Sequence, residues 1–220
     1  MSNIREQAIF EAHVHCINPS LRDIYLHSFY TEVSEGEPGV EYRQSTTFIK
    51  NLHLLDQAPY GPILVHMHTI GGSWDDGMAV YNAITFAKSK VTILGYAQAS
   101  SMSGIMLQAP KLRLLMPDCH FMMHHGWAGS YEEHPFALRN EATRQMKICE
   151  RMLQVFANRA ITGEFFKKKA DPQKAAYSFF KKKIEKNVDW ILEAEEAVYY
   201  GLADGVIGSK KYPDVHGLRK

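Results

Sequence analysis

The run from Ala97 to Gly104, AQASSMSG, carries its serines between an apolar segment and a helix-like one. A serine at a strand-to-helix turn presents its hydroxyl at the sheet edge, and the next backbone N–H lies free at a helix N-terminus, where negative charge is favoured. Ser101 could therefore attack an acyl group as a nucleophile. The competing interpretation is that Ser100 or Ser101 only caps the helix. Composition alone favours the cap, because helix caps vastly outnumber nucleophiles.

A histidine that could serve as the base stands in the run Phe121 to Gly126, FMMHHG. At the end of an apolar strand, His124 could reach a serine across the top of the sheet and act as a general base. The chain has 11 histidines, so chance proximity is a serious alternative. A metal site is a further alternative, since side chains two apart share a strand face. Its ligands would be His66, His68, His124 and His125. No carboxylate or cysteine falls at a recognisable ligand spacing, which disfavours the metal site.

A pair of glycines, Gly71 and Gly72, follows an apolar segment directly. Glycines at such a position let bare backbone N–H groups approach a ligand closely, which suits an oxyanion site. A glycine pair by itself is more often only a turn.

The elements that must position these residues follow from the hydrophobic pattern. Strands are expected at 24–26, 63–67, 91–94, 112–116 and 121–123. Helices are expected at 42–55, from Gly72 through 78–86, and at 102–109, 135–161 and 194–200. Residues 34–39 have the composition of a loop, and the lysine-rich stretch 167–183 predicts a protruding helical segment. Strands that alternate with helices in this way indicate βαβ units and a largely parallel sheet.

Composition places broad limits on the class of protein. The chain has 220 residues, of which 45% are hydrophobic, and this suits one domain over 1–220. The net charge of +1 provides no general attraction to nucleic acid or to an anionic membrane. Three scattered cysteines predict no disulfide framework and favour a reducing compartment. We see no signal peptide and no apolar run of the ~20 residues that cross a bilayer, so we expect a soluble, cytoplasmic protein.

Taken together, five ordered segments resemble the ClpP family of self-compartmentalising serine peptidases, over about residues 22 to 208. Residues 69–72, TIGG, stand where the family has SPGG, and 77–81, GMAVY, stand where it has a GMxIY run. Ser101-Met102 matches the family's nucleophile Ser-Met. Residues 116–125, MPDCHFMMHH, resemble its LPN and MIHQ segments, and 195–204, EEAVYYGLAD, resemble its EAxxYGLxD ending.

The resemblance implies an α/β fold of the ClpP/crotonase superfamily, with stacked βαβ units and a projecting helical handle at about 135–187 that carries an insertion. It implies a serine endopeptidase acting on peptides or unfolded proteins, with Ser101 as nucleophile and His124 as base. The N–H groups of Gly72 and Met102 would form the oxyanion site, and no cofactor is needed. The third catalytic residue is expected at Glu185, counted back without gaps from Ala194.

Asn187 and Asp189 compete with Glu185, because the insertion around 165–183 permits a shift. Residues 1–21 match nothing in the family's axial-pore segment, which puts docking to an AAA+ unfoldase in doubt. A chain this divergent resembles the phage-encoded or otherwise specialised branch of the family.

The expected partners are a peptide or unfolded-protein substrate and further copies of the chain, in a homo-oligomeric ring or two stacked rings. Alternative functions are a crotonase-like acyl-CoA hydratase or isomerase, which predicts paired carboxylates in the pocket, and a catalytically silent ring subunit, which predicts loss of Ser101 or His124.

Overall fold

A computed structural model describes residues 2–27, 39–57, 61–126 and 134–219. Its helices are α1 (Ser2–Val14), α2 (Tyr42–Leu55), α3 (Trp74–Phe86), α4 (Met102–Met106), α5 (Pro135–Ala160), α6 (Pro172–Asn187), α7 (Ala194–Tyr199) and the 3-10 helix η1 (His216–Arg219). Its strands are β1 (Ile17–Asn18), β2 (Asp23–Leu26), β3 (Ile63–Thr69), β4 (Val91–Ser100), β5 (Leu112–Leu115), β6 (His120–Met123), β7 (Trp190–Leu192) and β8 (Gly205–Val206). None of the described helices is both long and apolar enough to span a membrane.

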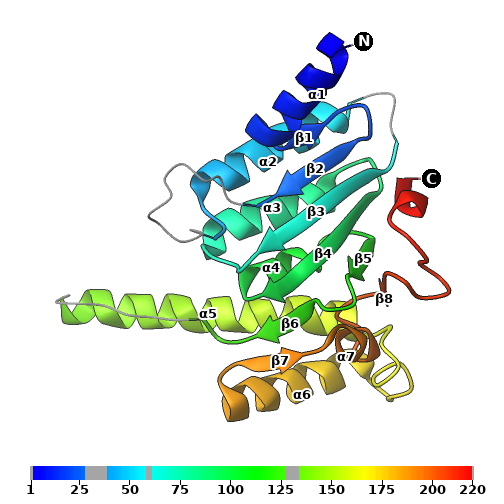
Figure 1. Ribbon diagram of the computed structural model, residues 1–220. Coiled ribbons are helices and arrows are strands. Elements are labelled where there is room, and N and C mark those ends of the chain that lie inside the picture. Colours follow the sequence, from blue (N-terminus) through cyan, green and yellow to red (C-terminus); the bar gives the residue numbers. More distant parts are fainter. Residues whose placement is uncertain (1, 28–38, 58–60, 127–133, 220) are drawn as a thin grey trace.

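The strands form one mixed, mostly parallel sheet in the order β1-β2-β3-β4-β5-β8, with β6 and β7 branching from β4 (Figure 1). The β1–β2 and β6–β7 pairs are antiparallel, and the other pairs are parallel. The long strand β4 pairs with β5 along its first half and with β6 along its second half. The end of β4 therefore lies between β3 and β6, which is where the sequence expects the serine and the histidine to meet.

The two faces of the sheet are covered differently, because successive side chains of a strand point to opposite faces. On one face, Val65 and Ile93 join the large core under α2, α3 and α4. On the other face, Leu64, Leu94 and Leu114 form a smaller cluster, and the C-terminal segment packs over it. Figure 1 shows this segment running along the side of the sheet to the C-terminus.

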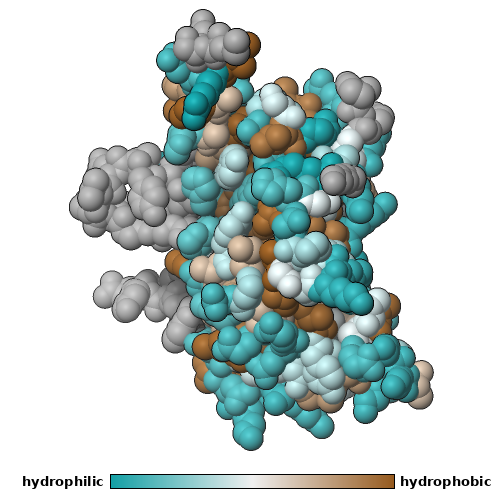
Figure 2. All heavy atoms as spheres, turned by 45° about the vertical axis from the view of Figure 1, so that its right-hand side comes forward, coloured by the Kyte–Doolittle hydropathy of each residue, from teal (hydrophilic) through white to brown (hydrophobic). Residues whose placement is uncertain are grey.

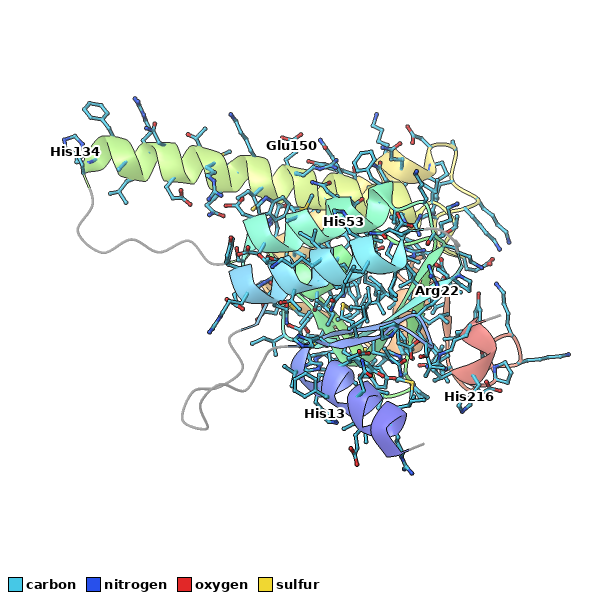
Figure 3. The ribbon with its side chains drawn as sticks, turned by 90° about the horizontal axis from the view of Figure 1, so that it is seen from above. His13, Arg22, His53, His134, Glu150 and His216 are labelled. Carbon is cyan, nitrogen blue, oxygen red and sulfur yellow. The ribbon has the colours of Figure 1, made fainter. Side chains whose placement is uncertain are left out.

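Helix α5 divides into a packed half and a projecting half. From Met152 to Ala160 it is largely buried, whereas Figures 1 and 3 show its first turns extending past the body of the molecule, with His134 at the far end. Helix α6 packs along α5 and buries Ala176, Phe180 and Ile184 in the core. The lysine-rich stretch therefore does not protrude as expected, because its apolar residues anchor it while its lysines face solvent.

The expected α/β fold is confirmed, and the differences are local. Strand β4 continues to Ser100, beyond the predicted end at 94, and α4 ends earlier than predicted. Helix α1 was not predicted, because its apolar residues follow no clear stripe. Several of them, including Ile4, Ile9 and Phe10, are exposed at one end of the molecule (Figure 2). Most of the predicted loop at 34–39 lies outside the described residues.

Candidate active site

Ser101 occupies a strained turn between β4 and α4. Its φ is 54° and its ψ is −126°, a region that non-glycine residues adopt at a cost of about 1–3 kcal/mol. The turn is held from both sides, because the Ser101 N–H donates to the Met122 carbonyl at 3.1 Å and the Ser101 carbonyl accepts from the Ile105 N–H at 3.3 Å. The Ser101 side chain makes no cap hydrogen bond to the helix. Its hydroxyl is therefore available for another partner.

That partner is His124, the residue after β6. Its Nε2 lies 2.7 Å from the Ser101 Oγ, and its Nδ1 lies 3.3 Å from a carboxylate oxygen of Asp189. An imidazole with its proton on Nδ1 donates to Asp189 and accepts from the Ser101 hydroxyl. Because the His124 side chain is only 12% exposed and that of Asp189 is 47% exposed, the carboxylate stands at the solvent side of the chain.

The geometry corrects the expected position of the acid. Glu185 lies on α6 with a half-exposed carboxylate 3.9 Å from the Lys181 ammonium, not on His124. Asn187, the last residue of α6, is exposed. The chain then turns at Val188, whose φ of 62° is unusual for a β-branched residue. This turn brings Asp189, rather than a residue of α6, to the imidazole.

The glycine pair packs directly against the serine turn. A Cβ on Gly71 would lie 2.7 Å from the Cβ of Ser101 and 2.9 Å from the Met102 nitrogen, so only glycine permits this approach. Gly72 has a φ of +145°, and a Cβ there would lie 2.4 Å from the Val40 carbonyl oxygen. The Met102 N–H is the first of α4 and has no intrahelical acceptor. Gly72 and Met102 line the same cleft as Ser101 and His124.

This cleft has a volume of about 460 Å³ and two chemically distinct parts. An apolar part lies between α4 and the middle of α5, and is formed by Ile105, Ile148, Met152 and Phe156. A polar rim contains Ser73 and Asp75 beside the glycines, and Arg144 and Gln145 on α5. This rim was not predicted from the sequence, since no local motif joins α3 to α5.

His125 also lines the cleft, directly after the imidazole that contacts Ser101. Its Nδ1 is buried and has no hydrogen-bond partner among the described residues. Burial lowers the pKa of His125 below its ordinary value, although the negative charge of Glu185 acts in the opposite direction. His125 is therefore neutral at neutral pH and adds no positive charge beside His124.

The histidines considered for a metal site take part in separate networks. His66 contacts Asp23 and Tyr96, whereas His124 contacts Ser101 and Asp189. His68 is exposed at the end of β3. Among the described residues, no group of three or more histidine, cysteine, aspartate or glutamate side chains is arranged to hold a metal ion.

Comparison with known proteins adds an independent observation. The model of the family described as Clp protease matches residues 36–210. The chain is 30% identical over 150 residues to ATP-dependent Clp protease proteolytic subunit 2 of Prochlorococcus marinus strain MIT 9312, a match that covers 66% of each chain. It is 28% identical over 160 residues to ATP-dependent Clp protease proteolytic subunit 3 of Synechococcus sp. strain CC9902, which covers 71% of this chain and 72% of that relative.

Proposed function

Since the chain belongs to the Clp protease family, we propose that it is a serine endopeptidase in which Ser101 is the nucleophile, His124 the general base and Asp189 the orienting acid. One observation carries this proposal. The Ser101 hydroxyl, on a strained turn that opens into a cleft, lies 2.7 Å from an imidazole whose other nitrogen is 3.3 Å from a carboxylate.

The reaction follows from the positions of these groups. As the Ser101 Oγ attacks a peptide carbonyl carbon, its proton passes to the His124 Nε2. Asp189 keeps the other imidazole proton on Nδ1 and stabilises the imidazolium. The imidazolium then gives its proton to the leaving amine, and water, activated by His124, hydrolyses the acyl-enzyme. No cofactor takes part in these steps.

The negative oxygen that forms on the attacked carbonyl needs donors at the same cleft. We assign this role to the N–H groups of Gly72 and Met102, which line the cleft on either side of the serine turn. Loss of one such donor typically lowers the rate by about 10²–10³-fold. The apolar part of the cleft accommodates an apolar side chain of an extended peptide, which supports unfolded proteins or peptides as substrates.

The alternative enzyme class finds less support at this cleft. A crotonase-like hydratase or isomerase would use paired carboxylates, whereas Asp75 is the one carboxylate among the described residues that line the cleft. A catalytically silent subunit would have lost the serine or the histidine. Here Ser101 and His124 are present and in hydrogen-bonding distance.

A serine-reactive fluorophosphonate probe tests the proposal directly. We expect the probe to label the protein at Ser101, and Ser101→Ala to lose the label while Ser100→Ala, the matched control, keeps it. Labelling of the Ser101→Ala protein, or no labelling of the unmodified protein, would reject Ser101 as the nucleophile.

We further propose that the protein works as a homo-oligomeric ring and that the projecting half of α5 contacts another ring. This half exposes Phe136, Leu138 and Met146, the last at 74%, and exposed apolar side chains in one region are typical of interfaces. The nearby lysines of α6 would repel one another across such a contact. Ring stacking is therefore expected to weaken at low salt, where charges are least screened.

Sedimentation velocity at two ionic strengths tests the assembly. A monomer in both buffers would contradict the ring, whereas a single ring in both would contradict only the stacking. Docking to an AAA+ unfoldase is not part of the proposal, because residues 2–18 form α1 and β1 and resemble no family segment.

A further inference from the structure

The first half of α5, residues 135–150, forms one wall of the substrate cleft while standing largely clear of the body. Figure 3 shows this half running outward from Glu150 to His134. Among the described residues, two side-chain contacts join it to the rest of the molecule. The Arg144 guanidinium donates to the Asp75 carboxylate at 2.7 Å, and the Cys149 thiol points at the His125 carbonyl at 3.5 Å.

The Arg144–Asp75 pair spans the polar rim of the cleft. Asp75 stands in the first turn of α3, three residues after Gly72, and therefore on the wall that carries the proposed oxyanion donor. Arg144 stands on the opposite wall, on the same helix as the apolar Ile148 and Met152. The pair thus ties together two walls between which a peptide must lie.

We propose that the Asp75–Arg144 ion pair is a strut that sets the width of the substrate cleft, so that Arg144 is a positioning residue for peptide binding. This inference rests on the proposed peptidase function. The hydrogen bonds and ion pairs of Ser101 and His124 involve neither Asp75 nor Arg144, so the strut acts on the binding of the peptide rather than on proton transfer.

The exposure of the pair limits the size of its effect. The Arg144 side chain is 49% exposed and that of Asp75 is 75% exposed. An ion pair this exposed changes an equilibrium constant by about 1.4- to 5-fold, and less at high salt. The strut therefore opens and closes readily, and it shifts the wall toward the closed position rather than locking it there.

A double-mutant cycle on cleavage of a fluorogenic peptide tests the strut. We expect Arg144→Gln and Asp75→Asn each to raise KM by about 2- to 5-fold with kcat nearly unchanged, as expected for loss of an exposed ion pair. The double variant should raise KM no more than either single change, because the two residues act as one unit. Arg139→Gln is the matched control, since Arg139 is on the same helix but does not line the cleft.

Salt provides a second readout. At about 1 M salt the Debye length falls to about 3 Å, so the KM of the unmodified protein should approach that of the variants, whose own KM values should not change. A lower KM in either variant would show instead that the pair blocks the cleft. Additive effects in the double variant, or equal KM values in all proteins, would overturn the strut.

Hydrogen–deuterium exchange separates this inference from the proposed function. Residues 136–147 should exchange faster in Arg144→Gln and Asp75→Asn than in Arg139→Gln, whether or not the protein cleaves the chosen peptide. Faster exchange without any peptide cleavage would support the strut and count against the peptidase. Cleavage with unchanged exchange and unchanged KM would do the reverse.

Discussion

Two chains of carboxylate, imidazole and hydroxyl occur in the described part of the molecule, and their dimensions are nearly the same. They are the cleft chain, Asp189–His124–Ser101, and the sheet chain, Asp23–His66–Tyr96. The two contacts of the imidazole measure 3.3 and 2.7 Å in the cleft chain. They measure 3.2 and 2.8 Å in the sheet chain. Hydrogen-bond lengths alone therefore do not distinguish them.

Their surroundings do. In the sheet chain the Asp23 carboxylate is 1% exposed and also accepts from the Arg219 guanidinium at 3.0 and 2.6 Å. Burial raises the pKa of Tyr96, so its hydroxyl is a poorer nucleophile than an ordinary tyrosine. In the cleft chain the hydroxyl stands on the strained Ser101 turn, beside the Met102 N–H and an open cleft. Such a chain by itself only relays a proton, and donors and access for a substrate decide whether it can do chemistry.

The largest expected effect separates the two hydroxyls. Ser101→Ala should lower peptide cleavage by about 10⁴-fold or more, because the nucleophile is lost while the fold is kept. Tyr96→Phe should leave kcat and KM within about two-fold, as expected for a change away from the cleft. Steady-state cleavage by the two purified variants measures this, with circular dichroism as the control for folding. Normal cleavage by Ser101→Ala would remove the distinction between the chains.

The next effect concerns the acid of the cleft chain. Asp189→Asn should lower kcat by about 10²–10⁴-fold, because the amide cannot hold the imidazole in the required tautomer or stabilise its positive charge. The half-exposed position of Asp189 places the effect toward the lower end, since water partly screens its charge. Glu185→Gln is the matched control and should stay near the unmodified rate. An inactive Glu185→Gln with an active Asp189→Asn would return the acid to Glu185.

Stability should respond in the opposite sense. Asp23→Asn should lower the free energy of unfolding by about 3 kcal/mol, because it leaves the buried side of the Arg219 and His66 contacts without their charged acceptor. Asp189→Asn should change this free energy by no more than about 0.5 kcal/mol. Urea unfolding followed by tryptophan fluorescence measures both values. Equal losses in the two variants would show that burial does not distinguish the chains.

The pH dependence of the Asp23 contribution follows from its pKa. Burial alone would raise the pKa of Asp23, but the hydrogen bonds and positive charges of His66 and Arg219 outweigh it and hold the pKa below its ordinary value. A carboxyl with a lowered folded-state pKa stabilises the fold above its unfolded pKa of about 3.9, and this contribution is lost as the pH falls through the lower folded value. The difference between the unmodified protein and Asp23→Asn should thus be constant at neutral pH and shrink below about pH 4. A difference that already shrinks between about pH 7 and 5 would contradict the lowered pKa.

The smallest effect concerns the hydroxyl of the sheet chain. Tyr96→Phe should lower the free energy of unfolding by about 1 kcal/mol, since the hydrogen bond to His66 is lost and the ring is kept. Tyr25→Phe is the control, because Tyr25 stacks on His66 with ring centroids 5.0 Å apart and keeps that contact without its hydroxyl. Thermal unfolding of the two variants side by side measures the difference, and equal midpoints would deny the Tyr96 bond its role.

Local sequence patterns were sufficient to predict most elements and the two residues that approach each other at the cleft. Hydrophobic periodicity placed α2, β3 and β6 nearly to the residue, because it records which side of each element is buried. The run around Ser101 predicted a strand-to-helix turn, and the run around His124 predicted a strand end. In parallel neighbouring strands such ends meet at one edge, so the contact between Ser101 and His124 could be expected from the sequence.

The carboxylate that completes the cleft chain, and the groups around it, depend instead on tertiary packing. Asp189 reaches His124 because α6 runs to Asn187 and the chain then reverses at Val188, whose left-handed backbone no residue pattern predicts. Counting along the sequence led to Glu185, since a count ignores where a helix ends and which way its last turn faces. The Arg144–Asp75 pair likewise joins helices through residues that lie 69 positions apart. Such contacts depend on the packing of whole elements, and the sequence near each residue contains no record of its partner.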